Sequence, residues 1–200
     1  GSGDCLFAVI RDAFNKIGKN VSVSELRNKL ADNVNQEIYE NYKQHYDMFS
    51  NSIVTNENEI KKLVKTNNEL REKLRNTSDR TEQEEIIQRA KHIGELHKSL
   101  KQETQLSKEL LQDFRIMNKV HSLEDFKKII KTCEFWADSW AISTLERIYN
   151  IKLIIFSSEY WSHKVTHNVL QCGDVIDPEI EKDGKFEPQY YILLDYTGNH

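Results

Sequence analysis

Apolar residues recur at helical spacing near the start of the chain. Residues 5–17 predict an amphipathic helix, and Gly18 marks its end. Ser22 with Glu25 three residues later is a capping-box pattern that predicts the start of a second helix. The expected inner face of the first helix consists of Leu6, Val9, Ile10, Ala13, Phe14 and Ile17, and that of the second consists of Leu26, Leu30 and Val34.

Between residues 56 and 112 the sequence becomes more polar and its apolar helical face becomes narrower. This stretch has neither proline nor an aromatic residue, and its apolar positions form two thin helical stripes separated by turn residues at 76–79. Thr81 with Glu84 is a further capping-box pattern. We therefore expect an antiparallel helical hairpin of coiled-coil type. The stripes consist of Ile60, Leu63, Leu70 and Leu74, then Ile86, Ile87, Ala90, Ile93, Leu96 and Leu100.

The segments on either side of this hairpin carry the aromatic residues and predict the core. Residues 36–55 are expected to continue as helix, with a looser point at residues 51–52. Ser122 predicts the cap of a short helix that carries Phe126. A further amphipathic helix is expected over residues 138–149, where Trp140 is either a core residue or the wall of a cleft.

Strand signals lie in the last quarter of the chain. Residues 151–156 form a nearly continuous apolar run, which is typical of a strand covered on both faces. Residues 165–170 predict a weaker strand and residues 190–196 a strong one. The predicted class is α+β, with a small central sheet flanked by helices. The predicted division is a core made of residues 1–55 and 113–200, into which residues 56–112 are inserted as an arm.

Composition argues against several kinds of partner. The formal net charge of −4 gives no electrostatic reason to expect a nucleic acid. No run of 18 apolar residues exists, so no membrane segment is expected. The cysteines, Cys5, Cys133 and Cys172, lack CxxC spacing and predict neither a disulfide framework nor a metal site. Their small number favours a reducing compartment, and no cofactor is expected.

Cys5 is the candidate nucleophile. It follows Gly3 and Asp4 and directly precedes an amphipathic helix, so the positive end of the helix dipole favours its thiolate. The neighbouring backbone N–H groups could hold an oxyanion, and Gly3 would leave room for a substrate carbonyl. The alternative is a buried cysteine in the first turn of a core helix.

A thiol nucleophile needs a histidine that accepts its proton. His200 follows the strong strand, and a residue just past a strand end can face a helix N-terminus across a cleft. His200 is therefore the candidate general base, against the alternative of a solvent-exposed histidine. His163 and His167 are rivals, although a polar loop and a weak strand favour surface or core-filling roles for them.

Three blocks carry a more specific pattern. They are Gly3-Asp4-Cys5-Leu6-Phe7, then Trp136-Ala137-Asp138-Ser139-Trp140-Ala141 with the run at 151–156, then Pro188-Gln189-Tyr190-Tyr191-Ile192-Leu193-Leu194 with Asn199-His200. In this order they resemble the Asp-Gly-Asn/Asp-Cys-Leu-Phe motif, the middle block and the closing strand with its Asn-His motif of the ovarian-tumour (OTU) family of papain-like cysteine proteases.

The resemblance implies a papain-like OTU fold and hydrolysis of isopeptide bonds at the ubiquitin C-terminus. Cys5 would be the nucleophile, His200 the general base, and Gly3 and Asp4 the oxyanion loop with the backbone of Cys5. The partner would be ubiquitin or polyubiquitin. Ser2 stands where the family usually has aspartate, and the sequence ends before the position where it often has Asn or Asp after the histidine. The third member of a triad is therefore unassigned.

The placement of the arm resembles the Lot class of OTU enzymes, which intracellular bacteria secrete as effectors. That resemblance implies a helical lobe that helps to bind ubiquitin, and action in a reducing cytosol, here the cytoplasm of a host cell. Tyr46, Phe49 and Ile53, near the base of the arm, are candidate ubiquitin-binding residues. The alternative is a spacer or self-association hairpin, and exposed Leu or Ile at its tip would favour ubiquitin.

Two other functions remain open from the sequence. One is a catalytically inactive OTU-like module that binds ubiquitin or scaffolds a partner, which the unassigned acid keeps in play. The other is a papain-like cysteine protease of another family, because an early cysteine and a late histidine are common to these enzymes.

Overall fold

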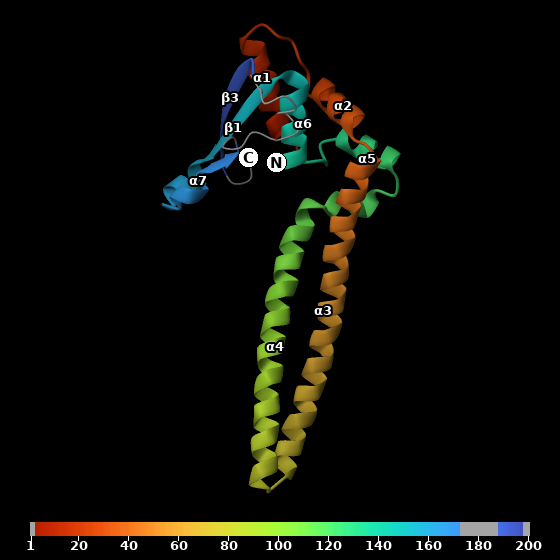
Figure 1. Cartoon of the computed structure of the whole chain (residues 1–200), viewed down its shortest axis with the longest axis vertical. Coiled ribbons are helices and arrows are strands. Elements are labelled where there is room, and N and C mark those ends of the chain that lie inside the picture. Colours follow the sequence, from red (N-terminus) through yellow and green to blue (C-terminus); the bar gives the residue numbers. More distant parts are fainter. Residues whose placement is uncertain (1–2, 173–187, 198–200) are drawn as a thin grey trace. The chain divides into compact units, whose positions relative to one another are not determined.

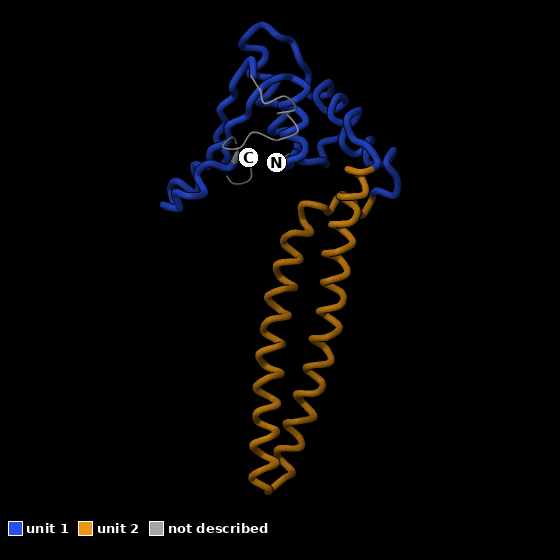
Figure 2. Tube along the Cα trace, viewed as in Figure 1, with its two compact units in different colours: residues 1–36, 120–200 blue, residues 37–119 orange. Residues whose placement is uncertain are grey.

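The computed structural model describes residues 3–172 and 188–197. These residues form two compact units, one of residues 37–119 and one of the segments before and after it (Figure 2). Helices predominate and a small mixed sheet accompanies them, which confirms the predicted α+β class. The elements in Figure 1 are α1 (Cys5–Lys16), α2 (Val23–Asn33), α3 (Gln36–Asn76), α4 (Arg80–Asp113), η1 (Arg115–Lys119), α5 (Leu123–Ile130), α6 (Ser139–Tyr149), β1 (Ile151–Ser157), α7 (Ser158–Ser162), η2 (Thr166–Asn168), β2 (Leu170–Cys172) and β3 (Tyr190–Tyr196).

The sheet is built around β1. β2 pairs with it antiparallel on one side and β3 pairs with it parallel on the other (Figure 1). The predicted weak strand over 165–170 was wrong in position, because residues 166–168 are a 3-10 turn and the strand comes after it. Coverage on both faces holds only for the first half of β1: Leu153 is fully buried, whereas Phe156 is 39% exposed.

The buried face of α1 differs from the predicted one. Ile10 and Phe14 are buried as expected, and Phe7, which the helical pattern did not select, is fully buried with them. Val9 is instead 41% exposed. The helix is therefore turned about its axis relative to the prediction, because its Leu6–Val9 side lines a cleft rather than the core.

Helix ends in this unit follow their local signals. The Ser22 hydroxyl accepts a hydrogen bond from the Glu25 N–H at 3.0 Å, and the Ser122 hydroxyl accepts one from the Asp125 N–H at 3.1 Å. α2 buries its predicted apolar face, α5 buries Phe126 as well as Ile130, and the two helices pack against each other. Gly18 has a φ of +77°, which suits the end of α1.

The arm consists of two long antiparallel helices, α3 and α4, as predicted. It begins earlier than expected, because α3 runs unbroken from Gln36 through residues 51–52, and the arm unit spans 37–119 rather than 56–112. Asp79, not Thr81, caps α4: its carboxylate accepts the Thr81 N–H at 2.9 Å. The buried stripe consists of Leu63, Leu70, Ile86 and Ile93, against which Leu74, Ala90 and Leu100 pack.

A polar layer lies beyond the end of this apolar stripe, toward the base of the arm. Asn56, Thr104 and Ser107 are all buried, at 6–7% exposure. The hydroxyl oxygens of Ser52 and Ser107 lie 3.3 Å apart, and the Thr104 hydroxyl donates to the Leu100 carbonyl. Asn56 Nδ2 is buried and has no hydrogen-bond partner among the described residues.

No described helix is both long and apolar enough to cross a bilayer.

Replacing Asn56 by leucine should stabilise the arm. A buried amide nitrogen without a partner costs about 1–3 kcal/mol, so Asn56→Leu is expected to raise the free energy of unfolding by about 1 kcal/mol in urea titrations followed by circular dichroism. Asn58→Leu, at an exposed position on the same helix, is the control and should change little. A lower stability for Asn56→Leu would show that this amide is better satisfied than the structure indicates.

Candidate active site

A cleft of about 570 Å³ lies at the N-terminus of α1. Its volume falls within the range of small-molecule and substrate clefts. Cys5 is half-buried and lines it, next to the apolar side chains of Leu6 and Val9. The opposite walls come from the segment that opens α6 and from the sheet. They consist of Trp136, Ala137, Ser139, Ile142, Ser143, Glu146, Lys152, Ile155, Gln171, Leu194, Asp195 and Tyr196.

Cys5 is the first residue of α1. The preceding Asp4 makes no side-chain cap to the first turn, and that turn contains no acidic residue. The backbone N–H groups of a first helical turn lack intrahelical partners and carry the positive end of the helix dipole. An oxyanion formed beside this first turn is therefore electrostatically favoured.

Gly3 is fixed by backbone contacts, which corrects two expectations. Its N–H donates to the Cys133 carbonyl at 3.1 Å, so this N–H is not an oxyanion donor. A Cβ at Gly3 would lie 2.4 Å from the Cys133 carbonyl oxygen and 2.7 Å from that of Phe135. Glycine is therefore needed here for a close approach of two backbone segments, rather than to leave room for a substrate carbonyl.

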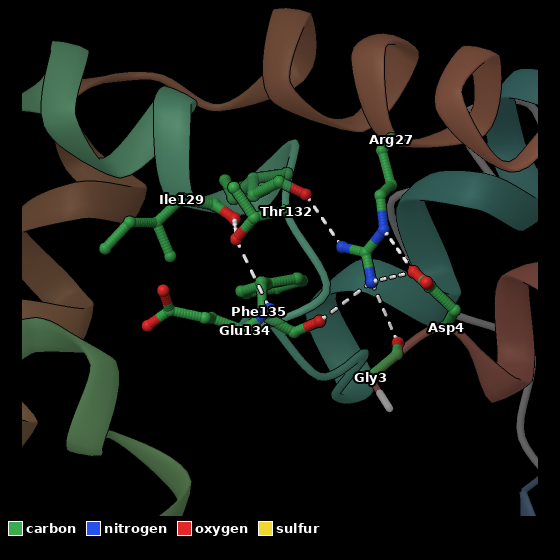
Figure 3. A network of polar contacts seen from close by, with 8 residues as sticks. Gly3, Asp4, Arg27, Ile129, Thr132, Glu134 and Phe135 are labelled. Atoms are coloured by element: carbon green, nitrogen blue, oxygen red, sulfur yellow. Dashed lines mark hydrogen bonds and ion pairs between the residues drawn. The ribbon is translucent and has the colours of Figure 1, made fainter. Parts of the chain in front are cut away.

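The carboxylate of Asp4 is taken up by an arginine from α2. Arg27 Nε and Nη2 both lie 2.8 Å from Asp4 Oδ1, and the arginine side chain is 3% exposed (Figure 3). This pairing directs the Asp4 carboxylate toward Arg27 of α2. The third member of a triad therefore stays unassigned, and the predicted oxyanion loop reduces to the backbone of Asp4 and Cys5.

The end of β3 reaches the same cleft as Cys5. Leu194, Asp195 and Tyr196 line it, and Asp195 Oδ1 accepts the Ser158 N–H at 3.0 Å. His200 follows four residues after Tyr196 in the sequence and lies outside the described residues, so its pairing with Cys5 stays a prediction.

The two rival histidines are described and do not line the cleft. His163 and His167 are both exposed, in the segment between β1 and β2. The His163 ring nitrogen Nδ1 lies 2.9 Å from the Glu159 carbonyl, in a contact local to α7. Neither is placed to act on the thiol of Cys5.

A buried ion pair lines the cleft, and the sequence analysis missed it. Glu146 is 2% exposed and Lys152 is 6% exposed, and both Glu146 oxygens lie 3.3 Å from Lys152 Nζ. Glu146 Oε1 also accepts the Leu153 N–H at 2.8 Å. The signal for it was a single lysine inside an otherwise apolar strand, since a buried ammonium requires a buried partner.

The aromatic residue at the cleft is Trp136 rather than Trp140. Trp136 is 53% exposed and lines the cleft beside Gly3. Trp140 is not among the lining residues, and its ring packs edge-on against Phe135 with centroids 6.4 Å apart. Trp140 is half-buried and packs on the buried Phe135, which favours the core alternative.

The candidate ubiquitin-binding residues on the arm are all half-buried. Phe49 belongs to an aromatic cluster in which its ring lies 6.0 Å from that of Phe114, and His45 stacks on Phe114 at 5.1 Å. The ammonium group of Lys43 lies over the Tyr46 ring, 5.2 Å from the ring centre. Phe49 in particular stabilises the base of the arm.

Comparison with known proteins adds no assignment. No family model matches the chain, and no curated protein or solved structure shows significant similarity to it. Within residues 3–172 and 188–197, no cluster of three or more histidine, cysteine or acidic side chains has the arrangement of a metal site. The site is thus characterised by its own geometry alone.

The close approach at Gly3 yields a test. Gly3→Ala is expected to lower the free energy of unfolding by about 1–3 kcal/mol, because its Cβ would meet backbone oxygens that cannot move aside easily. Gly94→Ala is the matched control: a Cβ there meets nothing within 4 Å, and alanine in a helix should stabilise α4 by up to about 1 kcal/mol. Thermal unfolding of both variants measures the difference, and equal stability of Gly3→Ala and wild type would contradict the close approach.

Proposed function

We propose that this protein is a thiol-dependent deubiquitinase of the OTU type. The observation that carries the proposal is the cleft itself, where a cysteine at a helix N-terminus and the end of β3 line one cavity. The sequence pattern that resembles the OTU family places its cysteine and its closing strand at these two positions. The papain-like fold and the ubiquitin substrate rest on that resemblance.

The proposed chemistry has two stages. The Cys5 thiolate attacks the carbonyl carbon at the ubiquitin C-terminus, the C–N bond to the lysine amine breaks, and the amine leaves with a proton from His200. Water, deprotonated by His200, then attacks the thioester and releases the ubiquitin carboxylate and the thiol. The oxyanion of each stage would be stabilised by the backbone at Asp4 and the first turn of α1.

The helical arm is proposed to contribute to ubiquitin binding. Its turn, at residues 77–79, is polar, but Ile87 in the second turn of α4 is 52% exposed and Leu106 is 55% exposed. Exposed aliphatic side chains on an otherwise charged helix suit the apolar patch by which ubiquitin is recognised. Tyr46 and Ile53, at the base of the arm, remain in the proposal as separate candidate contacts.

A ubiquitin probe with a C-terminal electrophile tests the enzyme. Wild type is expected to form a covalent adduct that Cys5→Ala abolishes and Cys133→Ala leaves intact, since Cys133 is an exposed thiol that does not line the cleft. His200→Ala should abolish turnover while ubiquitin affinity stays within about tenfold. Ubiquitin binding without an adduct would favour the inactive module, and absence of both would favour a protease of another family.

A substitution on the arm tests its role separately. Ile87→Glu is expected to raise KM for a ubiquitin substrate about tenfold with little change in kcat, because only binding energy is lost. Lys91→Glu, at an exposed position on the same helix, changes the charge by more and serves as the control. If both variants match wild type, Ile87 is not part of the substrate-binding surface.

A further inference from the structure

Arg27 is the most completely engaged polar side chain beside the cleft. It is 2% exposed and comes from α2. Besides Asp4, its guanidinium donates to the Ile130 carbonyl at 2.8 Å, the Gly3 carbonyl at 2.9 Å and the Phe135 carbonyl at 3.2 Å (Figure 3). Its flat face lies 4.1 Å from the centre of the Phe7 ring. A buried guanidinium is stable only with such full pairing.

These contacts join two segments that are far apart in the sequence. One is the pair Gly3 and Asp4, directly before the predicted nucleophile. The other is the turn after α5, which is itself ordered: the Thr132 hydroxyl donates to the Ile129 carbonyl and accepts the Glu134 N–H (Figure 3). The carbonyl groups of this turn are therefore ordered. Because Arg27 binds both these carbonyls and the residues before Cys5, it restrains those residues as well.

The bond to the Gly3 carbonyl fixes the direction of one further group. The peptide between Gly3 and Asp4 is trans, since the described residues contain no cis peptide. In a planar trans peptide the N–H points opposite to the C=O. Because the Gly3 carbonyl points at Arg27, the Asp4 N–H points away from Arg27. A flip of this peptide would break the bond from Arg27 to the Gly3 carbonyl, and the Gly3 N–H, which belongs to the preceding peptide, is held separately by the Cys133 carbonyl.

We propose that Arg27 is a positioning residue for the proposed reaction: it holds the Gly3–Asp4 peptide in the orientation that presents the Asp4 N–H to the oxyanion. This inference rests on the deubiquitinase proposal for its reaction, but its structural part, a clamp on the peptide before Cys5, stands on the contacts alone. Arg27 touches no reacting atom and acts through the backbone it holds.

A purely structural role predicts a different outcome from a positioning role. If Arg27 only stabilises the fold, its loss should lower the rates of both acyl transfer and thiol alkylation at Cys5, in proportion to the unfolded fraction. If it positions the oxyanion donor, its loss should slow acyl transfer and spare reactions in which no charge develops on oxygen. Alkylation of the thiol by iodoacetamide is such a reaction, because it displaces iodide at a saturated carbon.

The experiment compares two reactions of the same cysteine in a Cys133→Ala/Cys172→Ala background. Turnover of a ubiquitin–aminomethylcoumarin conjugate reports acyl transfer, and iodoacetamide reports the thiol. Arg27→Met removes the clamp, and Arg27→Lys keeps the charge but loses the planar fork. Arg147→Met is the control: that arginine is exposed and makes one long contact, 3.4 Å from Asn33. All are assayed well below their unfolding temperatures.

Arg27→Lys is the decisive variant, because Arg27→Met leaves several carbonyls unpaired and could fail to fold. The expected result is a loss of kcat of about 100-fold, as for removal of an oxyanion donor, with alkylation within about threefold of wild type. Asp4→Asn, which retains the Gly3 contact, should lose less. Unchanged kcat, or parallel loss of turnover and alkylation, would overturn the inference.

The inference is separable from the proposed function by a third measurement. Amide hydrogen exchange at Gly3, whose N–H is bound to the Cys133 carbonyl, should be faster in Arg27→Lys than in wild type or Arg147→Met if the clamp exists, and NMR measures it. A wild type that alkylates normally but never cleaves ubiquitin would overturn the deubiquitinase proposal, and the exchange rates would still decide the clamp. Equal exchange in all three proteins would overturn it.

Discussion

The structure around Cys5 depends on the close approach of its preceding residues to the turn after α5. Gly3 sits where no Cβ fits, its N–H is bound to the Cys133 carbonyl, and its carbonyl is bound to Arg27. The desolvation of the guanidinium must be offset by all of its hydrogen bonds together. The positions of the two segments are therefore mutually dependent, and the start of α1 is set by a contact more than a hundred residues away in the sequence.

The other side of the cleft is set by the parallel pairing of β1 with β3. Asn150, in the left-handed conformation at a φ of 51°, turns the chain directly from α6 into β1, so the helix and strand pack on each other. Glu146 then meets Lys152 across this short connection and also holds the Leu153 N–H. Because β3 runs parallel to β1 and also contacts α1, its end arrives at the cleft that Cys5 lines.

Features encoded by neighbours in sequence could be predicted, and those encoded by tertiary contacts could not. The caps at Ser22 and Ser122 and the turn of the arm involve residues within four positions of each other. The placement of Cys5 in a first helical turn is local in the same sense.

The orientation of α1 about its axis is not encoded locally, because a cleft on one side of the helix leaves Val9 outside the core. Arg27 gave no local signal, since one charged residue on an amphipathic helix usually faces solvent, and the backbone contact that requires Gly3 comes from residues 133–135.

The carboxylates around the cleft are held by specific partners. A carboxylate near a developing oxyanion opposes it unless the charge of the carboxylate is compensated. Three carboxylates lie near Cys5 or line its cleft: Asp4 is paired with Arg27 and Glu146 with Lys152, whereas Asp195 accepts the uncharged N–H of Ser158. The two cations of these pairs, Arg27 and Lys152, are almost removed from water. The paired charges of Asp4 and Glu146 therefore oppose an oxyanion at the N-terminus of α1 less than free carboxylates would, and the dipole of α1 acts in favour of that oxyanion.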